Sequence, residues 1–209
     1  MTDRSHGYVY DLENRITCIL GTDATCTSNT ATLYFYDASG DRVGKQQANT
    51  LEDYVYDPQG HIISVHDGAG SLVRAELYAG ARHVGSFNSS GTYAGLTYNH
   101  NDWLGSERVR SNASGTAFEW CTDTPYGMNL TCTNPTADTS PMHFTGKQRD
   151  YETGLDNFGA RYFGGGNNLA RFMTPDWSAS PAAVPYAKVE FHGFQAENFI
   201  ERIHMLFLT

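Results

Sequence analysis

The sequence has no long apolar runs, no surplus of basic residues and no visible signal-peptide pattern. No apolar run approaches the roughly 20 residues that a helix needs to cross a bilayer, so we expect no membrane span. Lys and Arg number 14 against 23 Asp and Glu, which gives a net charge of −9. A protein that follows a nucleic-acid backbone needs a basic surface, so we expect no nucleic-acid partner. The first residues are polar and show no signal peptide.

Motifs for metals and cofactors are also missing. The sequence has no HExxH, no DxDxDG and no paired CxxC. His61 and His66 lie five residues apart, so they would face opposite sides of a strand. We therefore expect no cofactor and no metal.

The four cysteines form two local pairs, Cys18 with Cys26 and Cys121 with Cys132. One hypothesis is that each pair is a disulfide that closes a hairpin in an oxidising compartment. The other is that all four are free thiols that serve as small apolar residues. Spacing alone does not decide between them, because a disulfide requires Cα atoms within about 7 Å.

Glycine and tyrosine are abundant, at 21 and 13 residues, and a repeated Tyr-x-Tyr-Asp unit stands at 8–14, 34–40 and 54–60. The two tyrosines lie two residues apart, so they face the same side of a strand. The Asp and the following Gly or Asn favour a tight turn, after which apolar residues begin a return strand. Each unit is thus expected to be a β-hairpin that must stack to bury its aromatic face. We predict an all-β fold of stacked antiparallel β-hairpins that form a twisted, curling sheet.

The densest motif lies at 141–177, and it reads HFTGKQRDYETGLDNFGARYF, a Gly- and Asn-rich turn, and RFMTPDW. This stretch resembles the signature of the RHS repeat-associated core domain of bacterial RHS and YD-repeat proteins. Residues 98–127, with DWLGSERVRSNASG and PYG, resemble the start of the same core. The Tyr-x-Tyr-Asp unit resembles the YD repeat of that family. The resemblance divides the chain into YD/RHS repeat hairpins at 1–97, a core at 98–177 and a divergent junction and tail at 178–209.

The resemblance implies a hollow shell of hairpins that encloses a C-terminal toxin or effector. This chain would then be a C-terminal piece of the shell of a bacterial polymorphic toxin or cell-surface protein. Its role would be non-enzymatic, in encapsulating or delivering the effector. Its partners would be the enclosed effector or other RHS shell segments. We expect it to be secreted or displayed at the cell surface as part of a larger exported protein.

The resemblance also implies a candidate catalytic pair, because some RHS cores cut themselves near their C-terminal end. The matching positions are Arg161 and Asp176, so a self-cleaving aspartyl-protease module is an alternative function. Two neighbouring carboxylates can share a proton, and one of them can then activate water. The family's downstream DPxG is absent, however, so the Asp that this motif would supply as the second carboxylate has no counterpart in the tail. We therefore expect no cleavage and a structural network in which Arg161 or Arg171 binds Asp176 or Asp156.

A third hypothesis is an extracellular carbohydrate-binding or adhesion module with cell-surface carbohydrate as its partner. Tyr and Trp side chains with Asn and Asp at turn tips could form a stacking platform, although the inner face of a β-shell explains the same aromatics more simply. The tail departs from the family pattern. Its apolar residues recur at helical spacing, which predicts an amphipathic helix that docks on a partner, or else arises by accident in a truncated or frame-shifted end. These residues are Ala196, Phe199, Ile200, Ile203, Leu206 and Phe207.

Overall fold

The structure is a computed structural model that describes residues 6–20, 24–27, 29–133, 140–159 and 161–175. The chain divides into two compact units, Met1–Met173 and Thr174–Thr209, and the fold below is that of the first. The predicted all-β class is confirmed, because the described elements are strands apart from two short 3-10 turns. The tail at 178–209, where a helix is one hypothesis, lies outside the described residues.

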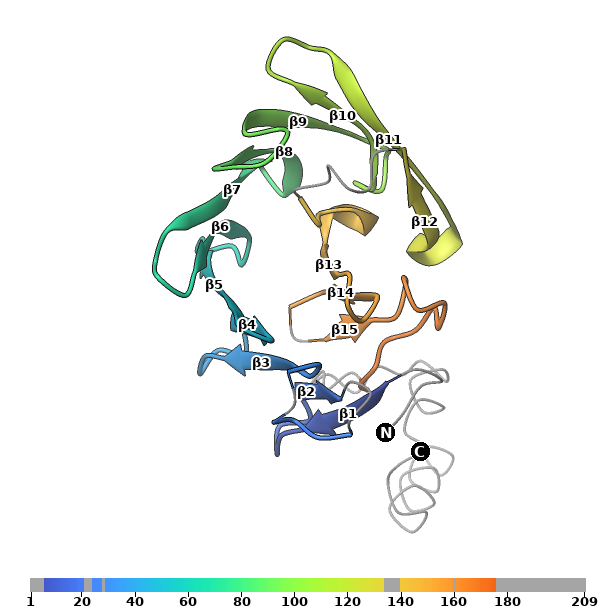
Figure 1. The fold of residues 1–209 in the computed structure, drawn as a ribbon. Coiled ribbons are helices and arrows are strands. Elements are labelled where there is room, and N and C mark those ends of the chain that lie inside the picture. Colours follow the sequence, from blue (N-terminus) through green and yellow to red (C-terminus); the bar gives the residue numbers. More distant parts are fainter. Residues whose placement is uncertain (1–5, 21–23, 28, 134–139, 160, 176–209) are drawn as a thin grey trace, which may run out of the picture. The chain divides into compact units, whose positions relative to one another are not determined.

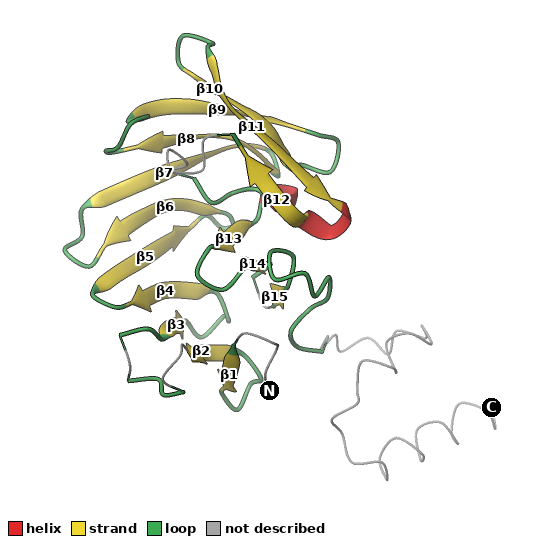
Figure 2. Cartoon of the chain, turned by 45° about the vertical axis from the view of Figure 1, so that its right-hand side comes forward, coloured by secondary structure: helices red, strands yellow, loops and turns green. Residues whose placement is uncertain are grey.

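Twelve antiparallel strands form one large sheet, in which each strand pairs with the strands before and after it in the chain (Figure 1). This order is the one that stacked hairpins produce. Figure 2 shows that the strand directions rotate along the stack, which gives the sheet its predicted twist. The strands are β1 (Gly7–Tyr10), β2 (Ile16–Leu20), β3 (Thr32–Tyr36), β4 (Arg42–Gln47), β5 (Thr50–Tyr56), β6 (Ile62–Asp67), β7 (Leu72–Ala79), β8 (Arg82–Asn88), β9 (Gly95–Asn101), β10 (Glu107–Asn112), β11 (Ala117–Thr124) and β12 (Met128–Cys132).

One turn recurs six times in this sheet and explains the Asp and the Gly of the repeated unit. In each copy an Asp or Asn side chain accepts hydrogen bonds from the backbone N–H groups two and four residues later. The residue three positions on has a positive φ, which Gly and Asn adopt at the least cost. A β-bulge adjoins each turn, as in three-residue hairpin loops. The six accepting residues are Asp11, Asp37, Asp57, Asp67, Asp102 and Asn112.

The tyrosines of the repeated units face inward, as their spacing predicts. Tyr34 and Tyr54 are buried, whereas Phe35 and Val55, which follow them in the chain, are each 44% exposed. A buried tyrosine needs a partner for its hydroxyl group. The Tyr34 hydroxyl donates to Asp150, a residue of the second sheet, at 2.6 Å. The repeats therefore bury their aromatic face against the core segment as well as against one another.

The second sheet comes from the densest motif and contains three short antiparallel strands, β13 (Gln148–Asp150), β14 (Leu155–Asn157) and β15 (Tyr162–Phe163). Both ends of the large sheet contact it. From β3, Tyr34 bonds to Asp150 on β13, and the carbonyl of Gly127, between β11 and β12, accepts a hydrogen bond from Arg149. The large sheet must therefore curve around the small one, as Figure 1 shows. The 3-10 turns are η1 (Pro125–Gly127) and η2 (Phe144–Gly146).

The large sheet is open at both ends. Within the described residues, β1 and β12 each pair with a single strand. The boundary that we expect at residue 98 falls inside β9, and strand pairing continues across it on both sides. The approach of β8 to β9 is close, because a Cβ atom on Gly85 would collide with the carbonyl oxygen of Thr97.

No helix among the described residues has the length and apolar character needed to cross a membrane.

Candidate functional site

A buried ion pair between Arg42 on β4 and Asp150 on β13 joins the two sheets. Nη1 of Arg42 lies 2.6 Å from Oδ2 of Asp150, and both side chains are 0% exposed. The Tyr34 hydroxyl donates to the same oxygen, and Nζ of Lys45 lies 3.4 Å from the other one. Burial by itself would raise the pKa of Asp150, but the nearby Arg42 and Lys45 charges outweigh burial and lower it.

Three tyrosine rings surround the guanidinium group of Arg42. Its central carbon lies 4.9 Å from the ring centre of Tyr34, 4.8 Å from that of Tyr54 and 5.7 Å from that of Tyr162. Two of these rings belong to repeated units, and Tyr162 belongs to β15. A desolvated cation over an aromatic ring is stabilised by about 2 kcal/mol. The cage therefore offsets part of the cost of burying the charge, and it ties the repeats to the core.

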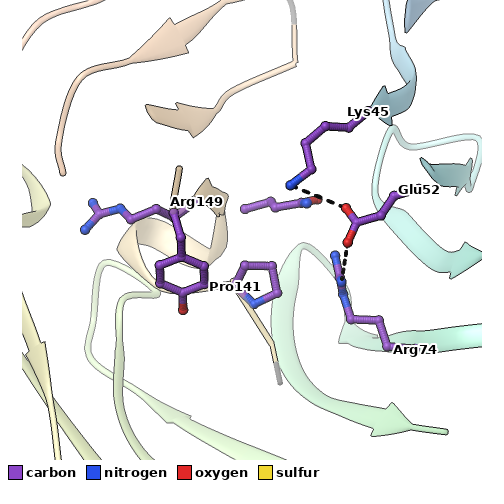
Figure 3. A pocket seen from close by; sticks show the side chains of 7 residues that line it. Lys45, Glu52, Arg74, Pro141 and Arg149 are labelled. Atoms are coloured by element: carbon purple, nitrogen blue, oxygen red, sulfur yellow. Dashed lines mark ion pairs between the residues drawn. The ribbon is translucent and has the colours of Figure 1, made fainter. Parts of the chain in front are cut away.

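A polar cavity of about 140 Å³ shares Lys45 with this ion pair (Figure 3). Its wall combines strands of the large sheet with the segment 141–151. Figure 3 shows Lys45 and Arg74 reaching toward Glu52 from two sides, at 3.5 Å and 3.9 Å. Because charged groups line the wall, the cavity suits water or a small polar molecule better than an apolar one. The lining residues are Lys45, Glu52, Arg74, Pro141, Gln148, Arg149 and Tyr151.

Two carboxylates beside Lys45 are shifted in opposite directions. Nζ of Lys45 lies 3.4 Å from Asp150 and 3.2 Å from Glu152. The pKa of Asp150 is lowered, whereas burial and the negative charge of Asp150 raise the pKa of Glu152. Carboxylates with separated pKa values can perform acid–base chemistry. Here both oxygens of Asp150 are already engaged by Arg42, Tyr34 and Lys45, so the arrangement suits a structural role.

A second buried network lies on β7 and β8. The carboxylate of Glu76, which is 0% exposed, accepts hydrogen bonds from Arg74 at 2.7 Å and from Ser86 at 2.6 Å, and it lies 2.7 Å from Nε2 of His83. Burial disfavours the ionised carboxylate, but His83, Arg74 and Ser86 outweigh burial and lower the pKa of Glu76 to about 2. Ser86 is fully buried and bonds directly to the carboxylate. This is not the order of a serine activated by a histidine, in which the histidine stands between the other two groups.

A third buried network joins β10 and β11 to the segment that precedes the small sheet. Arg110 lies 2.7 Å from Glu107 and 3.1 Å from Glu119, and all three side chains are buried. Arg110 also donates to the carbonyl of Ser140 at 3.0 Å. Nδ1 of His143 lies 3.5 Å from Glu107.

Of the two residues predicted for catalysis, Arg161 lies in the described part of the chain and Asp176 lies outside it. The guanidinium carbon of Arg161 lies 3.9 Å from the ring centre of Phe172. The chain reverses as the Gly- and Asn-rich turn predicts, because Phe163 and Phe172 form an antiparallel bridge. The pairing of Arg161 with Asp176 and the role of either residue in cleavage remain predictions.

The neighbouring carboxylate, Asp156, is a candidate partner of Arg161 or Arg171 on sequence grounds. In the structure Arg149 holds it through two hydrogen bonds of 2.8 Å and 2.9 Å. Burial raises the pKa of Asp156 to about 6, although the Arg149 charge opposes this shift. Arg149 and Asp156 stand opposite each other on β13 and β14, so the ion pair stabilises the small sheet from within.

The two cysteines of each pair lie close together, within one hairpin region. Sulfur–sulfur bonds link Cys18 to Cys26 and Cys121 to Cys132, with Cα atoms 6.0 Å and 4.2 Å apart. Both distances lie inside the limit of about 7 Å for a disulfide. Cys121 and Cys132 are direct cross-strand neighbours on β11 and β12. The oxidation state of the pairs in the protein's own compartment remains a prediction.

Sequence patterns did not single out the buried charged residues, yet one signal was present. Ile16 and Ile62 stand five positions after the turn Asp of their hairpins and are buried at the start of the return strand. Arg42 and Glu107 occupy the same position in two other hairpins and are also buried. A charged residue at a position where other copies carry isoleucine indicates a buried ion pair.

No protein-family model matches the chain. No curated protein matches it. Solved structures of Tc toxin assemblies do share its fold. A chain of the crystal structure of TcdB2-TccC3-TEV matches with a TM-score of 0.58 and 17% identity, over 82% of this chain and 9% of that chain. A chain of the crystal structure of TcdB2-TccC3-Cdc42 matches with a TM-score of 0.53 and 18% identity, over 76% of this chain and 8% of that chain. A chain of the Photorhabdus luminescens Tc holotoxin pore with a mutation in TccC3 matches with a TM-score of 0.55 and 18% identity, over 77% of this chain and 8% of that chain.

These likenesses establish the fold, a β-rich sheet that is shared with chains of Tc toxin structures. The chain spans 8% to 9% of the length of the toxin chains that it matches. It therefore corresponds to one segment of such a chain.

We expect the Arg42–Asp150 pair to dominate the stability of the junction between the sheets. Arg42→Met and Asp150→Asn should each lower the free energy of unfolding by about 3–5 kcal/mol, because each leaves a buried charge without its partner. The double variant should lose clearly less than the sum of the two. Urea denaturation of all four proteins measures this coupling. Arg15→Met, in a partly exposed ion pair with Asp11, is the matched control and should cost about 1 kcal/mol or less. Additive losses would contradict the assignment.

A second prediction concerns acid stability and Glu76. Its folded pKa of about 2 lies below the ordinary value of 4.5, so its contribution is present above about pH 4.5 and is lost as the pH falls toward 2. The difference in unfolding free energy between wild type and Glu76→Gln should be about 3 kcal/mol near neutral pH and should shrink over this range. Denaturation curves from pH 2 to pH 7 measure it. Glu152 should show the opposite pH dependence. Its folded pKa is raised, so its ionised carboxylate lowers the free energy of unfolding as the pH rises. A difference for Glu76→Gln that does not change with pH would overturn the assignment.

Proposed function

We propose that this chain is an RHS-type shell and core segment of a bacterial polymorphic toxin, which helps to enclose or deliver a C-terminal effector without catalysing a reaction. The observation that carries this proposal is the open twelve-stranded sheet that curves around the core strands. The fold shared with chains of Tc toxin structures supports it. As part of a larger exported protein, the chain would be secreted or displayed at the cell surface.

The two edges of the large sheet indicate how the chain would fit into a shell. An edge strand presents backbone N–H and C=O groups that can pair with another strand. In a larger shell, further hairpins would cover β1 on one side and β12 on the other. Because the chain corresponds to less than a tenth of the toxin chains that it matches, these hairpins would come from other shell segments.

The core strands would close one end of the shell. They contact the tyrosine-lined face through the Arg42–Asp150 pair and the β11–β12 hairpin through Arg149. Arginine side chains hold the carboxylates of Asp150, Glu76 and Asp156. A carboxylate that is held in this way stabilises the structure and is poorly placed to activate water. The described part of the site thus supports a structural role over a proteolytic one.

The edges should cause the isolated chain to associate. We expect wild type to form oligomers that grow with concentration, measured by light scattering after gel filtration. Lysines on both edges, in Val9→Lys/Thr131→Lys, should reduce this association, because charged edge strands resist pairing. The matched control, Val55→Lys/Leu77→Lys, places lysines on central strands at positions that are 44% and 38% exposed. It should associate like wild type. A wild type that stays monomeric at high concentration would contradict open edges.

The non-enzymatic role predicts a chain that stays intact. Intact mass spectrometry of purified wild type, sampled over days at neutral and acidic pH, should show a single mass. Asp176→Asn should show a single mass as well, changed only by the substitution. Two defined fragments from wild type, with cleavage between residues 178 and 188 that is abolished in Asp176→Asn or Arg161→Gln, would establish the self-cleaving alternative instead.

A further inference from the structure

A group of potential metal ligands surrounds the hairpin of β11 and β12. The sulfur atoms of Cys121 and Cys132 and a ring nitrogen of His143 all lie within 4.8 Å of one another. One carboxylate oxygen from each of Glu107 and Glu119 lies within the same distance of the Cys121 sulfur. In the structure the two sulfurs are joined to each other. The group therefore combines two sulfurs, an imidazole and carboxylates in one buried place.

We propose that, when Cys121 and Cys132 are reduced, this group binds one Zn²⁺ through both thiolates, His143 and the Glu107 carboxylate. Zinc prefers four ligands of these types at about 2.0–2.3 Å in a tetrahedron, which puts neighbouring ligand atoms roughly 3.5 Å apart. The ligand atoms of Cys121, Cys132 and His143 lie within 4.8 Å of one another, and Glu107 lies within 4.8 Å of the Cys121 sulfur and 3.5 Å from Nδ1 of His143, so the proposed ligands are near this spacing. The two cysteines supply facing sulfurs because they are direct cross-strand neighbours.

The histidine is oriented for this task. Its Nε2 lies 2.6 Å from the Tyr151 hydroxyl, and its Nδ1 lies on the side of Glu107, 3.5 Å from that carboxylate. A ligating histidine commonly bonds through its other ring nitrogen to a second group, which fixes the ring. The backbone holds it too, because the N–H of Glu107 donates to the carbonyl of His143 at 3.0 Å.

The charges around the site favour a cation. Two buried carboxylates, Glu107 and Glu119, share the guanidinium group of Arg110. One oxygen of Glu107, Oε1, is buried and has no hydrogen-bond partner within the described residues. A divalent metal would give this oxygen a partner and would balance the charge of two thiolates.

The disulfide and the metal site exclude each other, since both use the same sulfur atoms. A thiol reductant delivers two electrons to the Cys121–Cys132 bond, the bond breaks, and two protons complete the thiols while the reductant becomes a disulfide. Binding of Zn²⁺ then releases these two protons as the thiolates coordinate. The disulfide closes only the β11–β12 hairpin, whereas the metal would also fasten that hairpin to His143. The same hairpin would thus be secured by zinc in a reducing compartment and by the disulfide in an oxidising one.

The test is Zn²⁺ titration of the intact chain against a chromophoric chelator, with oxidised protein and with protein reduced by a phosphine. We expect one Zn²⁺ per reduced chain and none at this site when the chain is oxidised. Co²⁺ in place of zinc should give thiolate-to-metal charge transfer and the visible bands of a tetrahedral site. Circular dichroism follows the β-sheet throughout.

The variants separate this site from adventitious binding. Reduced Cys121→Ser/Cys132→Ser should lose the Zn²⁺. Glu107→Gln removes a proposed ligand and should weaken binding by at least the roughly 10–100-fold that loss of an outer-shell partner costs. His143→Gln should lose the nitrogen ligand from the Co²⁺ spectrum. The matched control, Cys18→Ser/Cys26→Ser, removes the other cysteine pair and should still bind one Zn²⁺. The proposal fails if reduced wild type binds no Zn²⁺, whether it stays folded or loses its sheet without regaining it on Zn²⁺ addition. It also fails if His143→Gln binds with unchanged affinity and spectrum.

Discussion

The arrangement of the two sheets depends on a buried charge that must find its partner. Arg42 stands at the start of a return strand in a position that isoleucine fills in other hairpins, and it has no access to water. An ionised group in such a place is costly unless an opposite charge and further hydrogen bonds meet it. Asp150 supplies them from a strand more than a hundred residues away. The position of β13 on the large sheet is therefore set by this requirement as well as by apolar packing.

Two further networks extend the same principle along the sheet. Glu76 is met by Arg74, His83 and Ser86, while Arg110 lies between Glu107 and Glu119. A sheet of stacked hairpins has a register problem, because a slip by one residue turns every inward side chain outward. Apolar side chains tolerate many partners, whereas a buried charge tolerates few. Networks of this type can therefore distinguish the correct register from its neighbours.

The local rules of the fold could be predicted from the sequence, and its long-range contacts could not. Tyrosines two residues apart and a turn Asp followed by Gly predicted hairpins with an aromatic face, and Tyr34 and Tyr54 confirm it. The repeated unit marks three hairpins, although the turns at Asp67, Asp102 and Asn112 form the same hydrogen bonds. These three turns are not preceded by Tyr-x-Tyr, so the turn depends on the Asp or Asn and the residue with positive φ, and not on the tyrosines. The partner of Arg42 was out of reach, because no local pattern links β4 to β13.

The motif that contains Asp150 shows why the core segment is more than an addition to the repeats. In sequence, the charged stretch QRDYETG at 148–154 predicts a turn, whereas its first three residues form the strand β13. In the structure, Arg149 and Asp150 point in different directions, toward the Gly127 carbonyl beside β12 and toward Arg42 on β4. Removal of this segment would leave Arg42 buried among the tyrosines without Asp150 as its partner. It would also remove the contact of Arg149 with the β11–β12 hairpin. The core segment thus contacts the repeats at β4 and the β11–β12 hairpin at the same time, and strand pairing continues across residue 98.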